Sequence, residues 1–165
     1  MSLEIALDSE GEWDSRSGHW ADLATRAFAA AIAESAHPHI ADIPAEVSLS
    51  LTDDEAVRSL NAQWRGKDKA TNVLSFPMLE TFDLPANGPP AMLGDIAMAY
   101  ETCAREASEK SLPLENHAGH LMVHGMLHLL GHDHQDDETA EDMEAREVRA
   151  LARIGIADPY LESAA

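Results

Sequence analysis

A histidine-rich segment, residues 117–134, constrains the fold of this chain more than any other part of the sequence. It reads H-A-G-H-L-M-V-H-G-M-L-H-L-L-G-H-D-H and holds six of the nine histidines. Its pattern predicts a helix over residues 114–130, in which His124 and His128 stand four residues apart. Side chains at this spacing project from one helix face, one turn apart. Two neutral imidazoles in that arrangement can bind one metal ion.

A third ligand has to come from outside this helix. At about 1.5 Å per residue, His120 lies roughly 12 Å along the axis from His128, too far for both to bind one ion through bonds of about 2.0–2.1 Å. Gly131 is suited to end the helix in a left-handed conformation and turn the chain back, so that His134 can approach the pair. His124, His128 and His134 then form a three-histidine set with room for a water, the pattern of a catalytic rather than a structural zinc site.

Length and composition limit the class of protein. The chain has 165 residues, with 45% hydrophobic and 25% charged residues, and we expect one domain over residues 1–165. The single cysteine, Cys103, excludes an intrachain disulfide and is consistent with a reducing compartment. The sequence has neither the pattern of a signal peptide nor that of a membrane span. We therefore expect a cytoplasmic protein with no membrane partner.

The charge is strongly negative but unevenly distributed. A net charge of −19 argues against a nucleic-acid partner, because binding to phosphates depends on Lys and Arg releasing counterions. Four of the eleven basic residues nevertheless fall within residues 58–69, namely Arg58, Arg65, Lys67 and Lys69. Taken alone, this basic segment is a solvated surface run, and only a position beside the histidines would give it a function.

Hydrophobic periodicity predicts an α+β fold. Alternating or short apolar runs predict strands at residues 3–7, 47–51, 71–78 and 93–100. Helical spacing predicts helices at about residues 17–35, 52–66, 103–111, 114–130 and 139–153. Thr52 and Glu55 have the spacing of a capping box for the second of these helices. The elements together indicate a mixed four-stranded sheet packed by helices, and we assign the last helix a structural role only.

The predicted metal centre has the groups that a hydrolase needs. A metal bound by three histidines lowers the pKa of a bound water toward about 7 and acts as a Lewis acid on a phosphoryl or carbonyl oxygen. The spacing H-x-x-x-H-x-x-G-x-x-H of residues 124–134 matches the metal frame of the metzincin proteases. Those proteases carry a glutamate directly after the first histidine as general base, where this chain has Gly125. Peptide hydrolysis by that route would lack the group that activates its water.

The sequence resembles the YbeY family of metal-dependent endoribonucleases more closely. The family signature H-G-x-L-H-L-x-G-[YH]-D-H stands here as H-G-M-L-H-L-L-G-H-D-H, residues 124–134. A second family segment is similar to N-A-Q-W-R-G-K-D-K-A-T-N-V-L-S-F-P, residues 61–77. L-G-D-I (93–96) and M-E-A-R-E…G-I-A-D-P-Y (143–160) also match. The resemblance covers roughly residues 45–160.

This resemblance implies a zincin-like α+β fold and one Zn²⁺ per chain, bound by His124, His128 and His134. It also implies cleavage of single-stranded RNA in ribosomal RNA maturation and in ribosome quality control. Ribosomal RNA and the ribosomal particle are then the implied partners, and DNA is not. The resemblance identifies Arg65 as a functional residue, and a guanidinium fits a phosphate with two parallel hydrogen bonds and stabilises charge developing on it. We therefore expect Arg65 to hold the phosphate.

Several side chains near these motifs keep two interpretations each. Lys67 and Lys69 are contacts to the RNA backbone or solvated surface residues. Asp133 is a general base or a carboxylate that orients a ligand imidazole, and Asp95 is catalytic or structural. His117 and His120 are most simply surface or core residues.

Two positions depart from the family pattern. His132 stands where tyrosine is common, and Asn72 where aspartate is frequent. His132 is also an alternative metal ligand, although its spacing would point it away from the pair.

Two other functions remain open at this level. One is a different metal-dependent hydrolase on the same frame, such as a protease or an amidase, against which Gly125 and the basic segment both argue. The other is a metal-binding ribosome-assembly factor without catalysis, in which a protein side chain would fill the fourth coordination position.

Overall fold

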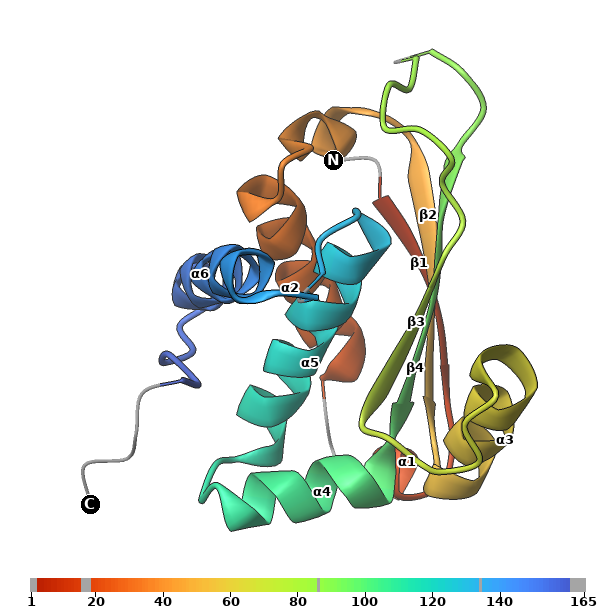
Figure 1. Ribbon diagram of the computed structural model, residues 1–165, viewed down its shortest axis with the longest axis vertical. Coiled ribbons are helices and arrows are strands. Elements are labelled where there is room, and N and C mark those ends of the chain that lie inside the picture. The colour runs from red at the N-terminus through yellow and green to blue at the C-terminus, as the bar shows by residue number, and fades with distance from the viewer. Residues whose placement is uncertain (1–2, 16–18, 86, 134, 161–165) are drawn as a thin grey trace.

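The centre of the fold is a four-stranded sheet in the order β1-β2-β4-β3 (Figure 1). The computed structural model describes residues 3–15, 19–85, 87–133 and 135–160. The strands are β1 (Leu3–Ser9), β2 (Ala45–Thr52), β3 (Val73–Pro77) and β4 (Ala91–Ala99). β1, β2 and β4 run parallel, and β3 pairs antiparallel with β4 at the edge of the sheet. This mixed sheet with flanking helices confirms the α+β prediction.

Helices cover the two faces of the sheet unequally. They are α1 (Glu12–Ser15), α2 (Trp20–Glu34), the 3₁₀ helix η1 (Pro38–Asp42), α3 (Asp54–Arg65), α4 (Tyr100–Glu109), α5 (Leu114–Leu129) and α6 (Asp137–Arg153). Figure 1 shows α2, α5 and α6 on one side of the sheet and α3 on the other. None of the helices in the described ranges is long and apolar enough to cross a membrane.

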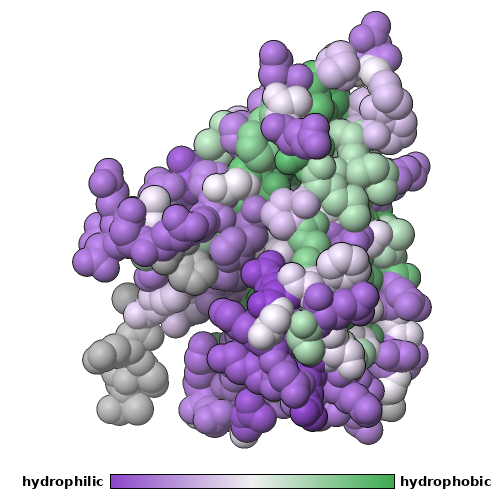
Figure 2. All heavy atoms as spheres, turned by 45° about the vertical axis from the view of Figure 1, so that its right-hand side comes forward, coloured by the Kyte–Doolittle hydropathy of each residue, from purple (hydrophilic) through white to green (hydrophobic). Residues whose placement is uncertain are grey.

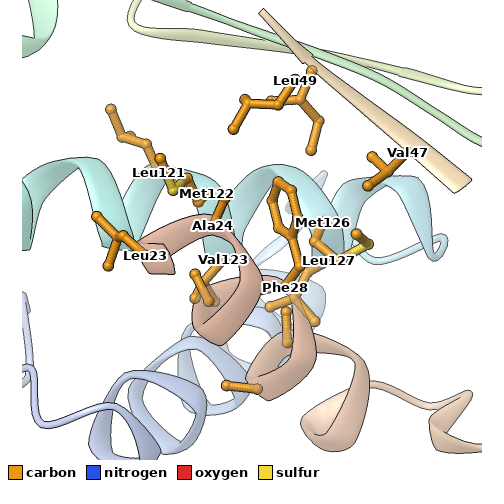
Figure 3. Packing of buried hydrophobic residues seen from close by; sticks show 14 of the residues in the cluster. Leu23, Ala24, Phe28, Val47, Leu49, Leu121, Met122, Val123, Met126 and Leu127 are labelled. Atoms are coloured by element: carbon orange, nitrogen blue, oxygen red, sulfur yellow. The ribbon is translucent and has the colours of Figure 1, made fainter. Parts of the chain in front are cut away.

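The main core lies between the sheet and the helix pair α2 and α5 (Figure 3). Phe28 of α2, Met122 and Met126 of α5 and Leu49 of β2 are all almost completely buried there. Burying an apolar side chain of this size contributes about 1.5–3 kcal/mol. α5 also contacts α4, α6 and the strands β3 and β4, so it is surrounded by other elements along most of its length. The histidine helix is therefore a central and rigidly packed element.

Gly125 allows α5 to approach the sheet closely. A Cβ atom at this position would lie 3.2 Å from side-chain atoms of Ile96 and from Ser75 Oγ. The Ser75 hydroxyl donates a hydrogen bond to the Gly125 carbonyl at 3.3 Å. A larger residue here would need the Ile96 and Ser75 side chains to shift by a few tenths of an ångström. Gly125 therefore lies in close contact with the sheet.

The ends of the helices agree with the predictions in most places. α5 begins and ends within one residue of the predicted range, and α3 ends at Gly66, which has φ +68°. The capping box predicted for Thr52 and Glu55 is wrong. Thr52 is the last residue of β2, and Asp53 is the N-cap, whose side chain accepts from the Ala56 N–H at 2.8 Å.

The reason is tertiary. Thr52 pairs with Ala99 across the sheet, and its hydroxyl donates to the Glu10 carboxylate, so strand pairing extends one residue further than local sequence indicates. The cap predicted at Ser17 lies outside the described residues.

Candidate metal centre

His124 and His128 face one another on α5. Their ring centroids are 4.6 Å apart with planes at 76°, and the two Nε2 atoms are 3.1 Å apart. Two nitrogens bound to one tetrahedral zinc at about 2.0–2.1 Å would be about 3.3–3.4 Å apart. The pair therefore has nearly the spacing that two ligands of one ion need. His134, the predicted third ligand, lies outside the described residues, and within those residues no three His, Cys, Asp or Glu side chains gather closely enough to hold an ion.

Glu147 of α6 reaches across to α5 and contacts two histidines. One carboxylate oxygen, Oε2, accepts from His124 Nδ1 at 2.7 Å, and the other, Oε1, accepts from His120 Nε2 at 2.7 Å. Oε1 also accepts from the Tyr160 hydroxyl. The Glu147 side chain is only 1% exposed. A buried carboxylate with three donors is well satisfied, whereas an unpaired one would be very costly.

The hydrogen bonds keep this carboxylate ionised. Burial alone raises the pKa of Glu147, but the hydrogen bonds from His120 and His124 outweigh it and lower the pKa from 4.5 to about 2. Burial raises the pKa of Tyr160, and its hydrogen bond to the same carboxylate adds to this effect. Glu147 is therefore a charged acceptor and Tyr160 a neutral donor at neutral pH.

The remaining two histidines of α5 are core residues with carboxylate partners. His117 is 1% exposed, and its Nε2 lies 2.8 Å from Glu106, which also accepts from the Asn72 amide at 3.0 Å. Burial lowers the pKa of His117, and Glu106 offsets part of this effect. His120 is likewise buried, with its Nε2 directed at Glu147. An aspartate in place of Asn72 would set two carboxylates against each other, whereas the amide donates to Glu106.

A cavity of about 380 Å³ opens beside the histidine pair. It is lined by His124 and His128, by β3 and the residues just before it (Thr71, Asn72, Val73, Leu74 and Ser75), and by the end of α3 with its turn (Asn61, Arg65, Lys67 and Lys69). Figure 2 shows the molecule with the side that carries α3 turned forward, and hydrophilic side chains gather over its lower half. The fold thus brings three basic residues of segment 58–69 to the same cavity as the two histidines.

The turn after α3 is built to hold these basic residues in place. Gly66 ends the helix, the Lys67 N–H donates to the Asn61 carbonyl at 3.2 Å, and the Asn61 amide donates to the Lys69 carbonyl at 2.9 Å. Arg65 Nη2 donates to the Ser75 carbonyl at 2.5 Å, and its guanidinium lies 5.3 Å from the centre of the Phe76 ring. One of the five N–H donors of Arg65 is used in this way, which leaves the others for a ligand.

Arg58 has a different position from the other basic residues. Its guanidinium makes two hydrogen bonds to Asp68, at 2.7 and 3.2 Å, and it does not line the cavity with Arg65. The pair is exposed, so it contributes little to stability. Arg58 therefore provides a control position for substitutions of Arg65 on the same helix.

The chain turns sharply after α5. Gly131 has φ +92°, its N–H donates to the His128 carbonyl at 3.0 Å, and the His132 N–H donates to the Leu127 carbonyl at 3.0 Å. This is a Schellman turn, and it confirms the predicted left-handed end of the helix. The turn begins the segment that carries His134.

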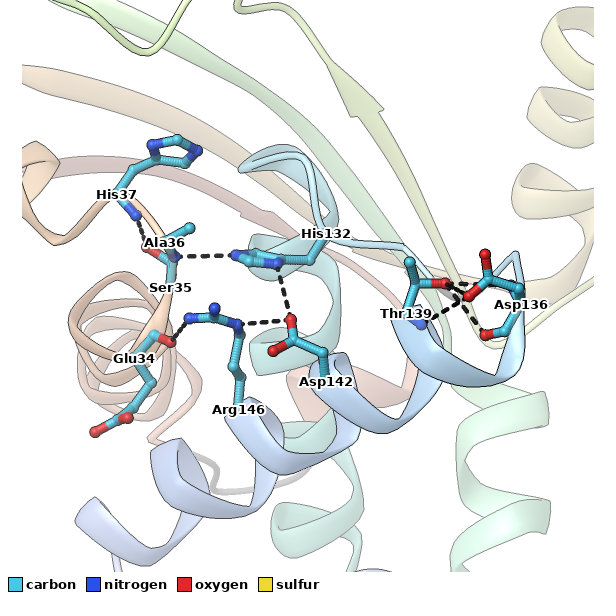
Figure 4. A network of polar contacts seen from close by, with 9 residues as sticks. All are labelled: Glu34, Ser35, Ala36, His37, His132, Asp136, Thr139, Asp142 and Arg146. Carbon is cyan, nitrogen blue, oxygen red and sulfur yellow. Dashed lines mark hydrogen bonds and ion pairs between the residues drawn. The ribbon is translucent and has the colours of Figure 1, made fainter.

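His132 points toward Ala36, just after α2, and toward Asp142 of α6 (Figure 4). Its Nε2 accepts from the Ala36 N–H at 3.1 Å, and its Nδ1 lies 3.8 Å from Asp142. Burial lowers the pKa of His132, and the charge of Arg146 adds to this effect. Its ring nitrogens therefore face α2 and α6, and the geometry does not support His132 as a ligand.

The two aspartates with open roles lie in different places. Asp133 is half-buried in the turn between His132 and His134. Asp95 lies in β4 and lines a separate groove of about 690 Å³ together with Trp64, Phe76 and Met78. Asp95 is therefore not among the residues that line the cavity beside His124.

Sequence reasoning missed Glu147, because α6 was expected to have a structural role only. The structure places Glu147 of that helix in contact with His120 and His124. A signal was present in the sequence. Met143, Glu147, Ala150 and Leu151 follow helical spacing, and all four are buried, so a carboxylate stands on the apolar face of an otherwise ordinary amphipathic helix.

Comparisons with known proteins identify relatives over nearly the whole chain. A model of the family described as "Endoribonuclease YbeY" matches residues 10–155. A protein named Endoribonuclease YbeY from Erythrobacter litoralis is 55% identical over 166 residues and covers 97% of this chain and 98% of its own length. A protein of the same name from Sinorhizobium fredii is 48% identical over 164 residues, with 97% and 92% covered. A solution structure of a Thermotoga maritima protein has TM-score 0.55 at 22% identity, covers 92% of this chain and 91% of its own, and shows a similar fold.

Proposed function

This chain belongs to the YbeY family of endoribonucleases, and on that premise we propose that it is a zinc-dependent endoribonuclease that cleaves single-stranded RNA in ribosomal RNA processing and ribosome quality control. The observation that carries the proposal is the shared cavity, which His124 and His128 line together with Arg65, Lys67 and Lys69. Groups that bind a metal and groups that bind a phosphate need to reach the same phosphodiester, and this cavity is lined by residues of both kinds.

The donor atoms fit a zinc ion. His124 uses its Nδ1 on Glu147, which leaves its Nε2 directed at His128. Imidazole nitrogens are preferred zinc ligands, and we assign His134 as the third. A bound zinc would supply a Lewis acid for a phosphoryl oxygen and a water of lowered pKa.

Arg65 binds and orients the phosphate. Its guanidinium is anchored by the Ser75 carbonyl and by Phe76, yet the residue is exposed at the cavity. A planar guanidinium can hold two oxygens of one phosphate and stabilise the charge that builds up on them. Lys67 and Lys69 add positive charge along the same wall, where the RNA backbone would approach.

The overall charge favours an RNA held in a larger particle. The chain carries a net charge of −19, so long-range attraction of free RNA is weak. Contacts with proteins of a ribosomal particle would bring the RNA to the local basic surface. We accordingly propose a single-domain cytoplasmic enzyme whose partners are ribosomal RNA and the ribosomal particle.

The test compares metal-loaded wild type with three variants on a labelled single-stranded RNA, on the same RNA annealed to its complement, and on ribosomal particles. We expect wild type to cut the single strand only when metal is present. Arg65→Ala should reduce the rate by about 10²–10³-fold, the range for losing a donor to developing charge, and His128→Ala should abolish metal-dependent cleavage. Arg58→Ala is the matched control and should leave the rate unchanged, because its partner is Asp68.

The outcomes separate the alternatives. The endoribonuclease proposal fails if wild type cuts neither free RNA nor ribosomal RNA in its particle more than His128→Ala does. Metal-dependent binding to particles without any cleavage would identify an assembly factor instead. Equal losses for Arg58→Ala and Arg65→Ala would show that net charge, rather than the placement of Arg65, matters.

A further inference from the structure

Glu147 does not line the 380 Å³ cavity but contacts His124 directly. Its carboxylate lies between α5 and α6, and the hydrogen bonds to His124 and His120 span 23 and 27 residues of sequence. Both bonds are 2.7 Å long, the length of charge-assisted hydrogen bonds. A carboxylate on one helix thus holds two imidazoles on another.

The direction of each hydrogen bond follows from the 2.7 Å contacts between carboxylate oxygens and ring nitrogens. An ionised carboxylate can only accept hydrogen bonds, and Glu147 is buried with only donors around it among its described partners. His124 must therefore present Nδ1–H, and His120 must present Nε2–H. A neutral imidazole carries one N–H, so the other nitrogen of each ring keeps a lone pair.

His120 provides an independent check on this protonation pattern. Its Nδ1 is buried and has no hydrogen-bond partner among the described residues. A buried N–H without an acceptor would be costly, whereas a lone pair without a donor is tolerated more easily. The environment of His120 thus fits a proton on Nε2, directed at Glu147.

The consequence falls on the metal-binding atom of His124. With the proton on Nδ1, the lone pair is on Nε2, which lies 3.1 Å from Nε2 of His128. With the proton on Nε2 instead, His124 could not bind an ion at that place. We propose that Glu147 is a positioning residue, which fixes the tautomer and the ring orientation of His124 for metal binding while Tyr160 and His120 hold its carboxylate in place. This inference rests on the proposed metal centre.

The alternative is that Glu147 merely joins α6 to α5. Glu147→Gln tests this, because glutamine keeps the size but offers only one acceptor oxygen for two N–H groups. Loss of an outer partner of a ligand histidine typically lowers metal affinity by about 10–100-fold. Glu144→Gln is the matched control, since Glu144 is on the same helix and borders the same small cavity of about 180 Å³ but has no hydrogen bond to either histidine in the described structure. Tyr160→Phe removes one donor to the carboxylate and keeps the His124 contact.

The first measurement is the zinc dissociation constant of metal-free protein, obtained by competition with a chromophoric chelator and without RNA. We expect about 10–100-fold weaker binding for Glu147→Gln, unchanged binding for Glu144→Gln, and a smaller loss for Tyr160→Phe. Circular dichroism confirms that each variant is folded. A folded Glu147→Gln variant that binds zinc as wild type does would overturn the inference and leave a purely structural contact.

The second measurement is the ¹⁵N chemical shift of the His124 ring in metal-free wild type, assigned with a His124→Asn variant. We expect the Nδ1–H tautomer in wild type and its loss in Glu147→Gln. The Nε2–H tautomer in wild type would overturn the inference even if no zinc is bound. Neither measurement involves RNA, so failure of RNA cleavage with both results intact would reject the proposed function and leave the role of Glu147 standing.

Discussion

Replacing Gly131 by alanine tests how the turn after α5 is held. Gly131 has φ +92°, and a Cβ atom there would lie 3.3 Å from two ring atoms of Phe82. Phe82 belongs to the long connection between β3 and β4, where its ring stacks on His37 at 4.0 Å and its carbonyl lies 2.7 Å from His39 Nε2. The ring therefore cannot move aside without disturbing these contacts. Two costs are combined at Gly131, one from the backbone and one from the ring.

The two costs can be separated with Gly155. Gly155 has φ +79°, and a Cβ atom there would meet nothing within 4 Å. A left-handed conformation costs an alanine about 1–2 kcal/mol, offset by about 0.4–1 kcal/mol from the restricted unfolded chain. Gly155→Ala should therefore destabilise by roughly 0–1.6 kcal/mol. Crowding against Phe82 should add about 1–3 kcal/mol to this cost for Gly131→Ala.

The assay is urea denaturation of metal-free protein for wild type, Gly131→Ala, Gly155→Ala, Phe82→Ala and the double variant Phe82→Ala/Gly131→Ala. In the Phe82→Ala background, the alanine at 131 should cost no more than the alanine at 155 does in wild type. The reasoning is refuted if Gly131→Ala is no more destabilising than Gly155→Ala, or if its extra cost persists after the ring is removed. Stabilisation by Gly131→Ala would show that the turn is not left-handed in solution.

Three further predictions concern the rest of the fold. Hydrogen bonds from Arg149 and Arg153 lower the pKa of Glu34 below its ordinary 4.5. The ionised Glu34 carboxylate therefore stabilises the folded protein fully above pH 4.5, and this stabilisation is lost as the pH falls through the lowered pKa of the folded state. Glu34→Gln should lower the free energy of unfolding by about 1 kcal/mol at pH 7. In urea titrations the difference in unfolding free energy between the variant and wild type should disappear in acid, and a difference independent of pH would contradict this. Leu49→Ala should lower the free energy of unfolding by about 2–5 kcal/mol, because the side chain is 1% exposed in the core, and a loss under 1 kcal/mol would mean that the core is loosely packed. Burial raises the pKa of the Cys103 thiol, so an aromatic disulfide reagent at pH 8 should react only after unfolding, and rapid reaction of native protein would show an open site.

Local sequence was sufficient for the elements that depend on short-range chemistry. The range of α5 follows from its apolar spacing. Its end follows from Gly131, because a glycine adopts the left-handed conformation there without the steric cost of a side chain. β1 and β2 follow from alternation, since one face of each is more buried than the other, and β3 and β4 follow from short apolar runs. The spacing of His124 and His128 is likewise a property of any helix. Where a tertiary partner intervened, at Thr52, the local prediction failed.

The composition of the candidate site was decided by the tertiary structure. Arg65 lies beside His124 because α3, β3 and α5 all line one cavity. No local pattern predicts which of the four basic residues will line this cavity and which, like Arg58, will form an ion pair at another place. Family resemblance singled out Arg65, whereas the pairing of Glu147 with His124 depends on α6 crossing α5.

The chain by itself thus determined the helix that carries the histidine pair, because helix geometry and a glycine turn act over a few residues. Tertiary packing decided that Glu147 of α6 contacts Nδ1 of His124 and that Arg65, Lys67 and Lys69 line the same cavity as His124. These contacts join segments that lie far apart in the sequence, so no local pattern predicts them.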